Sequence, residues 1–299
     1  MSTPSISVLT VTYNSEDHLP AFLEVLLPEL DSCGGELILV DNASTDATRS
    51  LIQNGVQHKA FVKIIENRKN LGFAIANNQA LAIAEGTDIL LLNPDTAVET
   101  GAIQGLLESL HESENRGAVA PQLRFSDGRI QRSCRRFPTH LNILTQMLGL
   151  GLLFPRSRWA NGWKMGDFDH EQSRDVDQPA AAALLIRGDL YRELEGLNEQ
   201  FPMFFNDVDL CRRIHQRGYR IRFDARYRVI HAGGGSVRRR PLAMVVSSQL
   251  SFFRYFERSY TGLLYQVPNL LLGMLLYLAI IPRILFHFLP RRKGRRDVL

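Results

Sequence analysis

Short apolar runs in the first hundred residues alternate with longer segments whose apolar positions follow a helical period. Four runs have the β-branched and leucine-rich composition of buried strands, and they cover residues 6–11, 36–40, 62–65 and 88–92. Helices are expected between them, with Asn14 and Ser15 before the first, Ser44 before the second, and the alanine-rich stretch 74–85 as the third. This alternation predicts an α/β fold with a mostly parallel sheet, right-handed crossovers and flanking helices.

The pattern is less regular in the second half of the chain. An apolar run at 180–186 predicts a further strand, and residues 207–217 predict a helix that Gly218 closes. Two short strands are expected next, at 219–223 and 226–230.

The last sixty residues differ in composition, being amphipathic at first and strongly apolar from about 263 to 289. The stretch 270–281 is broken by Pro282-Arg283, so it is shorter than the about 20 apolar residues that span a bilayer. Five basic side chains and one Asp in the last ten residues favour contact with anionic lipid. We expect an apolar helical segment, 241–299, that docks on the membrane in-plane or as a re-entrant helix. A full span and a helix pair packed on the preceding domain are the alternatives.

Polar side chains follow three of the predicted strands at the point where each strand ends. They are Tyr13 and Asn14, Asp41 and Asn42, and Asp95. Ligands of open α/β sheets bind at the carboxyl ends of strands, so this repeated placement predicts a binding site. The turn 41–46 offers a carboxylate to a ribose or base and helix N–H groups to phosphate, whereas capping alone is the alternative interpretation.

Asp95 and His231 are candidate metal ligands. A hard divalent cation that also binds substrate phosphate oxygens needs few protein ligands, and Asp95 follows a buried strand directly. His231 ends a predicted strand and precedes three glycines, where its imidazole could complete a metal sphere or contact a diphosphate. A Pro-Asp turn and a structural histidine are the alternatives.

Two carboxylates, Asp207 and Asp209, lie at the start of the helix predicted after residue 206. The helix dipole and the free N–H groups there stabilise an ionised carboxylate, which suits a general base. Ordinary capping of the helix is the alternative.

Composition and charge indicate the class of protein and its compartment. Hydrophobic residues make up 45% and charged residues 22%, as in ordinary globular proteins, and the net charge of +4 is concentrated near the end of the chain. We expect no nucleic-acid partner. The cysteines Cys33, Cys134 and Cys211 lie far apart, which favours reduced thiols in the cytosol. Residues 1–5 lack a basic region, so we expect no signal peptide.

Six segments follow one another along the chain: VTYNS, DNASTDAT, NLGFAIANNQ, LLNPD, FFNDVDLCRRIHQRG and IHAGGGS. Together they resemble the family-2 glycosyltransferases, and SCRRFPT resembles the rhamnosyltransferase-like branch of that family. The resemblance covers about residues 5–240. It implies a GT-A fold with a Rossmann-like sheet and inverting transfer of a sugar. The implied catalytic domain, 1–240, has a nucleotide-sugar half, 1–100, and an acceptor half, 101–240.

The resemblance also implies roles for single residues. The nucleotide-binding edge maps to Thr10, Tyr13, Asn14, Asp41, Asn42, Asn70 and Gly72. Asp95 represents the DxD-type metal motif, and His231 matches a late histidine that helps to hold the metal, Mg²⁺ or Mn²⁺, and the diphosphate. Asp207 stands at the base position, and Asn206 stands where Glu is common, which bears on acceptor positioning. Further candidates for acceptor or diphosphate contacts are Asp209, Arg238 and Arg239, the two arginines being equally compatible with a solvated loop.

The expected partners are a nucleotide-diphosphate sugar and a glycan or polyprenyl-linked acceptor. The reaction would serve cell-surface polysaccharide synthesis at the inner face of the cell membrane, and the resemblance favours rhamnose as the sugar. Two other function classes stay open. A sugar-phosphate nucleotidyltransferase would share the sheet and the metal, but the chain has no early glycine-rich phosphate loop. A non-catalytic sugar-binding or assembly protein would be expected to have lost Asp95 or Asp207, and both are present.

Overall fold

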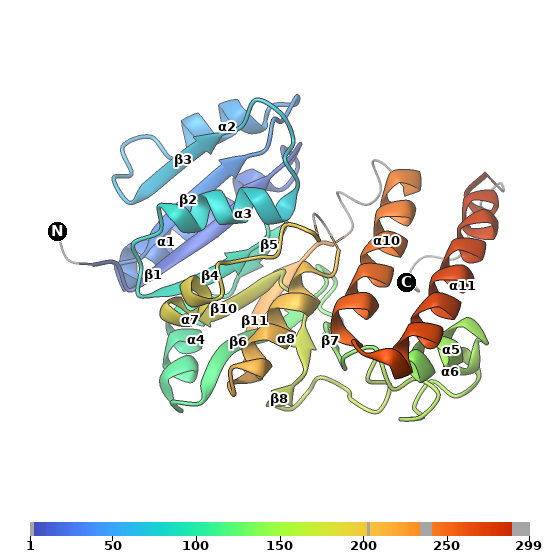
Figure 1. The fold of residues 1–299 in the computed structure, drawn as a ribbon. Helices are drawn as coiled ribbons and strands as arrows, with labels where there is room; N and C mark the ends of the chain where they lie inside the picture. The colour runs from blue at the N-terminus through green and yellow to red at the C-terminus, as the bar shows by residue number, and fades with distance from the viewer. Residues whose placement is uncertain (1–2, 202–203, 234–240, 289–299) are drawn as a thin grey trace. The chain divides into compact units, whose positions relative to one another are not determined.

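The computed structural model describes residues 3–201, 204–233 and 241–288, and in the last range it places the side chains of 246–278. The chain divides into two compact units, Met1–Gly235 and Ser236–Leu299 (Figure 1). The domain boundary predicted after residue 240 lies beside the segment 234–240, which is outside the described residues, as are Arg238 and Arg239.

One sheet organises the first unit. Within the described residues it contains nine strands in the order β3-β2-β1-β4-β10-β6-β11-β5, with β8 paired to β11. The strands are β1 Ile6–Thr12, β2 Glu36–Asp41, β3 Val62–Glu66, β4 Asp88–Leu92, β5 Thr96–Val98, β6 Arg116–Arg124, β8 Arg174–Val176, β10 Ala183–Arg187 and β11 Arg220–His231.

The sheet is parallel on one side and mixed on the other. β3, β2, β1 and β4 pair in parallel. β10 then lies antiparallel between β4 and β6, and β11 runs parallel to β6 but antiparallel to β5 and β8. The α/β fold is confirmed, and its parallel pairing is confined to the β3–β4 side and the β6–β11 pair.

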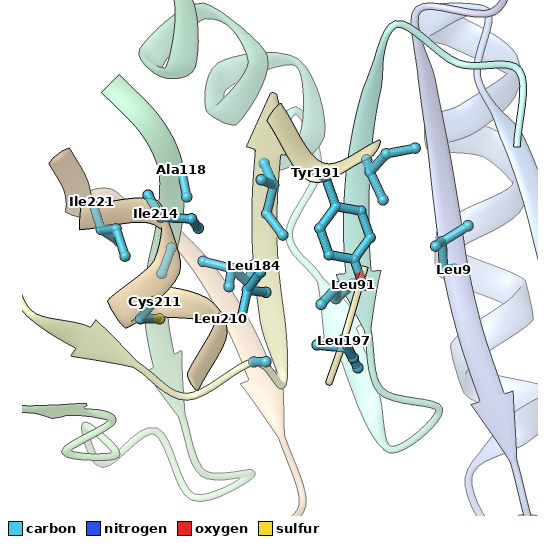
Figure 2. Close-up of a cluster of buried hydrophobic side chains, with 14 of the residues drawn as sticks. Leu9, Leu91, Ala118, Leu184, Tyr191, Leu197, Leu210, Cys211, Ile214 and Ile221 are labelled. Atoms are coloured by element: carbon cyan, nitrogen blue, oxygen red, sulfur yellow. The ribbon is translucent and has the colours of Figure 1, made fainter. Parts of the chain in front are cut away.

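Helices cover both faces of the sheet because successive strand residues point to opposite sides. Leu9 and Leu91 pack in one cluster with side chains of α3, α7 and α8. Val8 and Leu90 pack in a second cluster with α1, α2 and α4. Figure 2 shows the first cluster, in which the ring of Tyr191 lies among leucines of the sheet and of the loop after α7. The helices are α1 Leu19–Cys33, α2 Thr48–Gly55, α3 Phe73–Ala82, α4 Ala102–His111, α7 Gly188–Glu193 and α8 Asn206–Gln216.

Two predicted elements of the second half differ in the structure. The short strands expected at 219–223 and 226–230 are one strand, β11, with an irregularity between Asp224 and Arg228. The buried carboxylate of Asp224 accepts hydrogen bonds from Ser109, Ser173 and Arg226, which hold the chain at this bulge. The strand expected at 180–186 begins only at Ala183, because β9 (Gln178–Pro179) pairs separately with β7 (Cys134–Arg135).

The side chains of the predicted site lie at one edge of the sheet because the strands that carry them run in the same direction. β10 is antiparallel to both β4 and β6, so β1, β2, β4, β6 and β11 all run the same way. Their carboxyl ends therefore meet at one edge of the sheet, which is where ligands of α/β proteins bind. α8 runs back across the sheet before β11 begins, so the first turn of α8 lies at that edge as well (Figure 1).

The second unit contains a helical hairpin of α10 (Pro241–Ser259) and α11 (Leu263–Phe288). Gly273 permits close approach, since a Cβ there would lie 2.6 Å from Cε2 of Phe253. α11 continues through Pro282, where the sequence predicted a break, because a proline removes one helical hydrogen bond and can kink a helix without ending it. Within the described part of the chain, no helix combines the length and the hydropathy needed to cross a bilayer.

Candidate active site

The sheet brings Asp95 and His231 together, although 135 residues separate them in the sequence. β5 pairs with the end of β11, with Thr96 opposite His231, and the N–H of Ala232 donates to the carbonyl of Asp95 at 3.0 Å. As a result, Nε2 of His231 lies 3.4 Å from Oδ1 of Asp95. The other ring nitrogen, Nδ1, lies 2.8 Å from Oε1 of Gln131, which orients the imidazole.

The donor set at this pair fits a divalent cation. If Nδ1 carries the proton that is donated to Gln131, the lone pair of Nε2 faces an oxygen of Asp95. Two ligand atoms that each lie about 2.1 Å from one cation, with an angle of about 90° at the cation, are about 3 Å apart. The 3.4 Å between Nε2 of His231 and Oδ1 of Asp95 is close to this distance. Within the described residues there is no cluster of three or more His, Cys, Asp or Glu side chains that could hold a metal. Asp95 and His231 would therefore hold a cation only together with ligands from a substrate or water.

Asp95 is ionised at neutral pH. Burial opposes ionisation most strongly, but when the ring of His231 is protonated, its hydrogen bond and charge, together with the charge of His18, bring the pKa of Asp95 below its ordinary value. A carboxylate that keeps its charge in a half-buried position is suited to binding a cation.

The predicted nucleotide-binding residues form a hydrogen-bonded network along the same edge. Asn42 lies at its centre, donating to Oδ1 of Asn70 and to the carbonyl of Gly72, while its own Oδ1 accepts from Asn67 and from the N–H of Leu71. Gly72 has φ +88°, in the left-handed region that glycine adopts without strain, and the N-terminus of α3 follows it directly. These residues shape the rim of the edge from β2 to α3.

Asp41 and Thr10 are fully buried. Oδ2 of Asp41 accepts from Nε of Arg49 at 2.7 Å and from the N–H of Ser44 at 3.1 Å, so it fixes the turn after β2. The hydroxyl of Thr10 donates to the carbonyl of Leu92 at 2.9 Å and is directed into the sheet. Both residues stabilise the loops at this edge of the sheet, and their contact with a ligand stays a prediction.

Tyr13 and Asn14 follow β1 at the same edge and are half-buried. Asn14 has φ +53°, and its N–H donates to Oγ of Ser44 while its Oδ1 accepts from the N–H of Thr45. The loops after β1 and β2 are thereby joined. Thr12, which was not among the predicted site residues, lies at this junction, with its hydroxyl 3.3 Å from Oδ1 of Asp41.

Asp207 is the second residue of α8, and its carboxylate accepts hydrogen bonds from backbone N–H groups. One of its oxygens accepts from the N–H of Val208 at 2.9 Å, and the N–H of Ala181 also donates to the carboxylate. Burial raises the pKa of Asp207, while these N–H groups and the charge of Arg135 act in the opposite direction. A carboxylate with a raised pKa is a stronger base, which suits proton abstraction at neutral pH.

Asp209 has a different environment from Asp207. Nε of Arg213, one turn along α8, donates to Oδ2 of Asp209 at 2.7 Å, and the side chain is 14% exposed. Arg213 also donates to the carbonyls of Leu194 and Gly196. The Asp209–Arg213 pair therefore ties α8 to the loop after α7, and the predicted contact of Asp209 with an acceptor or diphosphate stays untested.

Three further residues of this region, Gln131, Arg135 and His170, were not predicted from the sequence. Gln131 orients His231, and Arg135 lies on β7 within electrostatic range of Asp207. Burial lowers the pKa of His170 to about 4, and the neutral ring accepts from the N–H of Cys134 at Nε2 and lies 3.2 Å from the carbonyl of Phe168 at Nδ1. Only the SCRRFPT motif, which contains Arg135, gave a signal in the sequence.

Comparison with proteins of known sequence identifies relatives over most of the chain. An N-acetylglucosaminyl-diphospho-decaprenol L-rhamnosyltransferase of Mycobacterium tuberculosis is 26% identical over 271 residues, covering 87% of this chain and 86% of that protein. The O-antigen biosynthesis protein RfbC of Myxococcus xanthus is 27% identical over 238 residues, covering 79% of this chain and 18% of that protein.

Solved structures share the fold at lower identity. The mannosyltransferase PcManGT of Pyrobaculum calidifontis, in complex with GDP-Man and Mn²⁺, superposes with a TM-score of 0.59 at 17% identity, covering 95% of this chain and 73% of that one. GalNAc-T7 with UDP, GalNAc and Mn²⁺ has a TM-score of 0.58 at 14% identity, covering 77% and 44%. These likenesses confirm the predicted GT-A architecture.

The sequence model of glycosyl transferase family 2 matches residues 7–170, more than half of the chain. The matched part runs from the second residue of β1 past β7, and hence contains Asp95 and all the residues predicted to bind the nucleotide. The chain therefore belongs to glycosyl transferase family 2 and is a glycosyltransferase.

Proposed function

We propose that the protein transfers a sugar, with inversion, from a nucleotide-diphosphate donor to a hydroxyl of a polyprenyl-diphosphate-linked saccharide during cell-surface polysaccharide synthesis. Rhamnose is the proposed sugar because the mycobacterial relative, which aligns over most of both chains, is named as an L-rhamnosyltransferase acting on such a lipid. The observation that carries the proposal is the meeting of Asp95, His231 and the start of α8 at one edge of the sheet.

Asp207 acts as the general base in this proposal. Its carboxylate takes the proton of the acceptor hydroxyl, and the oxygen then attacks the anomeric carbon on the side opposite the leaving diphosphate. The N–H groups of Val208 and Ala181 hold the carboxylate in place, so little reorganisation accompanies proton transfer. Asn206 accepts from the N–H of Asp207 at 2.7 Å and thereby fixes the first turn of α8.

Asp95 and His231 would hold a divalent cation, Mg²⁺ or Mn²⁺, against the donor diphosphate. When bound, the cation neutralises the charge that develops on the departing nucleoside diphosphate. Gln131 keeps Nε2 of His231 directed at Asp95, and the rim formed by Asn42, Asn70 and Gly72 receives the nucleoside. Two solved neighbours contain Mn²⁺ with a nucleotide or nucleotide sugar, which supports this division of roles.

The proposed site of action is the inner face of the membrane, with α11 on the lipid surface. Most of its exposed apolar side chains recur every three to four residues and form one stripe, with Tyr265 outside it: Leu263, Leu264, Val267, Leu270, Leu271, Met274, Leu275, Tyr277 and Leu278. The helix carries no charged residue before Arg283, and the chain ends in a basic segment. An apolar stripe followed by basic residues is typical of helices that lie in the lipid interface.

The direct test is a screen of nucleotide-diphosphate sugars with a polyprenyl-diphosphate-linked N-acetylglucosamine acceptor, with Mn²⁺ and with EDTA. The proposal predicts release of nucleoside diphosphate, dependent on the cation and fastest with dTDP-rhamnose, and a product of inverted anomeric configuration by NMR. Retention of configuration would exclude the role of Asp207 as base. Release of pyrophosphate would instead favour a nucleotidyltransferase, and a chain that binds donors without turnover would be a sugar-binding protein.

A further inference from the structure

An apolar surface projects from the first unit between β7 and β8. It consists of exposed side chains on and around α5 (His140–Met147) and α6 (Leu150–Leu153), which we name the α5–α6 surface: Leu141, Leu144, Met147, Leu148, Leu152, Leu153, Phe154 and Trp159. Leu152 is 81% exposed and Leu153 70%. Elsewhere in the described part of this unit, the exposed large apolar residues are the scattered Ile64, Ile83 and Ile230. A concentration of this kind marks a binding surface.

Two cations, Arg135 and Lys164, lie in the same segment as this surface, and Arg135 is within electrostatic range of Asp207. Arg135, on β7, stands opposite Gln178 of β9, and the chain leads from there to Ala181, whose N–H donates to Asp207. Lys164 follows Trp163, whose carbonyl accepts the N–H of Arg136 at 2.9 Å, so Lys164 also flanks β7. Desolvation lowers the pKa of both Arg135 and Lys164, and the charge of Arg135 lowers that of Lys164 further.

Some N–H groups of these two side chains have no hydrogen-bond acceptor among the described residues. Arg135 donates from Nη1 to the carbonyls of Arg132 and Cys134 at 2.7 and 2.8 Å. In the described part of the chain, its Nε and Nη2 have no hydrogen-bond acceptor, and neither Arg135 nor Lys164 forms an ion pair with a carboxylate. The charge of Asp207 acts on Arg135 without an ion pair between them. Two neighbouring cations that repel one another and have no ion-pair partner among the described residues form a site for an anion with several oxygens.

The cations and the apolar surface belong to one connected segment. Nε2 of Gln146 on α5 donates to Oδ1 of Asn161, and Nδ2 of Asn161 donates to the carbonyl of Pro155. The ion pair between Arg136 and Asp167 and the hydrogen bond from Cys134 to His170 then fasten the loop to β7. Figure 1 shows α5 and α6 set apart from the sheet, beyond β7.

We propose that residues 132–170 bind the lipid–diphosphate part of the acceptor. The diphosphate lies against Arg135 and Lys164, the polyprenyl chain lies along the α5–α6 surface, and the saccharide extends towards Asp207. The inference rests on the acceptor class of the proposed function. An amphiphile is the occupant because the anion site and the apolar surface adjoin. A bilayer surface alone would use the exposed Arg156 and Arg158 at the rim and leave the half-buried Arg135 unused.

The two tryptophans of the protein, Trp159 and Trp163, both lie in this segment, so selectively excited tryptophan fluorescence reports on it alone. The full-length protein is titrated with polyprenyl diphosphate in detergent micelles, with empty micelles as the reference. Polyprenol without phosphate and inorganic pyrophosphate serve as comparison ligands. We expect saturable binding of polyprenyl diphosphate with a blue shift of the emission, at least about tenfold tighter than either comparison ligand.

Arg135→Gln and Lys164→Gln should each raise the Kd of polyprenyl diphosphate about tenfold, because each removes one charge-assisted contact. Leu152→Asp should abolish the blue shift, and this side chain is exposed enough for the variant to fold. Lys59→Gln, at an exposed lysine between α2 and β3, is the matched charge control and should bind normally. Ile83→Asp, at an exposed isoleucine directly after α3, is the matched apolar control and should also bind normally.

Equal affinity of the wild type for polyprenol and polyprenyl diphosphate would overturn the anion site. The same conclusion would follow if Arg135→Gln weakened the binding of free nucleoside diphosphate and left polyprenyl diphosphate unaffected, since Arg135 would then serve the donor. The fluorescence measurement needs no turnover. A wild type that releases nucleoside diphosphate in the donor screen but does not bind polyprenyl diphosphate refutes this inference alone, whereas failure of every donor refutes the proposed function alone.

Discussion

The imidazole of His231 faces Gln131 at Nδ1 and Asp95 at Nε2. At the scale of the residue, this arrangement leads to a prediction for metal binding. Asp95→Asn and His231→Gln should each weaken cation-dependent binding of nucleoside diphosphate, the former more strongly, because a carboxylate brings charge to a hard cation. Titration calorimetry with dTDP, in Mn²⁺ and in EDTA, measures the difference. Asp127→Asn, at an exposed carboxylate, is the control. Wild-type affinity that does not change with Mn²⁺ would refute both roles.

Tyr191 is fully buried, and within the described residues its hydroxyl has no hydrogen-bond partner. Burying an unsatisfied hydroxyl costs about 1–3 kcal/mol, so Tyr191→Phe should leave the free energy of unfolding unchanged or raise it by about 1 kcal/mol. Urea denaturation followed by circular dichroism measures the change. A loss of more than about 1 kcal/mol would mean that the hydroxyl makes a stabilising contact.

Residue type and position along the chain predicted which polar groups reach the edge of the sheet, but not which partners they meet there. Asp41 and Asn42 are adjacent, yet the carboxylate of Asp41 is held by Arg49 whereas Asn42 forms the rim. Asp207 and Asp209 share one helical turn, and only Asp209 has an arginine one turn ahead that reaches it. Such choices depend on packing between elements, which a single sequence does not display.

At the scale of the element, His170 fastens the loop after α6 to β7, and its burial makes that link sensitive to pH. The folded protein protonates this ring near pH 4, whereas the unfolded chain does so near the ordinary value of about 6.5. The unfolded state therefore binds more protons between these values. Stability from this group is complete above about pH 6.5 and is lost as the pH falls towards 4, by up to about 3 kcal/mol.

His170→Gln keeps an acceptor for the N–H of Cys134 and removes the titration. The variant should thus lose less stability than the wild type between pH 7 and pH 4.5 in urea denaturation. His58→Asn, at an exposed histidine, should retain the wild-type pH dependence. Identical slopes for His170→Gln and the wild type would show that the ring is not buried as a neutral base.

Periodicity predicted the elements whose partners are near in sequence, and β1 to β4 follow the predicted runs within one or two residues. It did not predict β5, because a three-residue strand has too few positions to establish a period, and it did not predict the longer α4 and β6 either. The single strand β11 was divided in the prediction since Asp224 and Arg226 interrupt the apolar pattern at a bulge that side-chain hydrogen bonds stabilise. The pairing of β5 with β11, which brings Asp95 to His231, is a long-range contact without a local signal.

At the scale of the whole molecule, the apolar stripe on α11 supports the proposal that the protein attaches to the membrane. Leu264→Asp and Leu271→Asp should each reduce binding of the full-length protein to vesicles containing phosphatidylglycerol, about tenfold or more, because each replaces an exposed apolar contact with a charge. Gln266→Glu, on the same helix, adds charge without removing apolar surface and is the control. Co-flotation with vesicles measures binding. Wild-type protein that stays unbound at low salt would contradict the membrane role.

The central claim is that Asp207 removes the acceptor proton during glycosyl transfer, and its most direct test is the turnover of Asp207→Asn in parallel with donor binding. The substitution preserves the size of the side chain and its place at the start of α8 but removes the base. The account predicts that transfer to the polyprenyl-linked acceptor falls about a hundredfold or more while the Kd for the nucleotide-diphosphate sugar changes by less than about threefold. Near-normal turnover of Asp207→Asn would contradict the account.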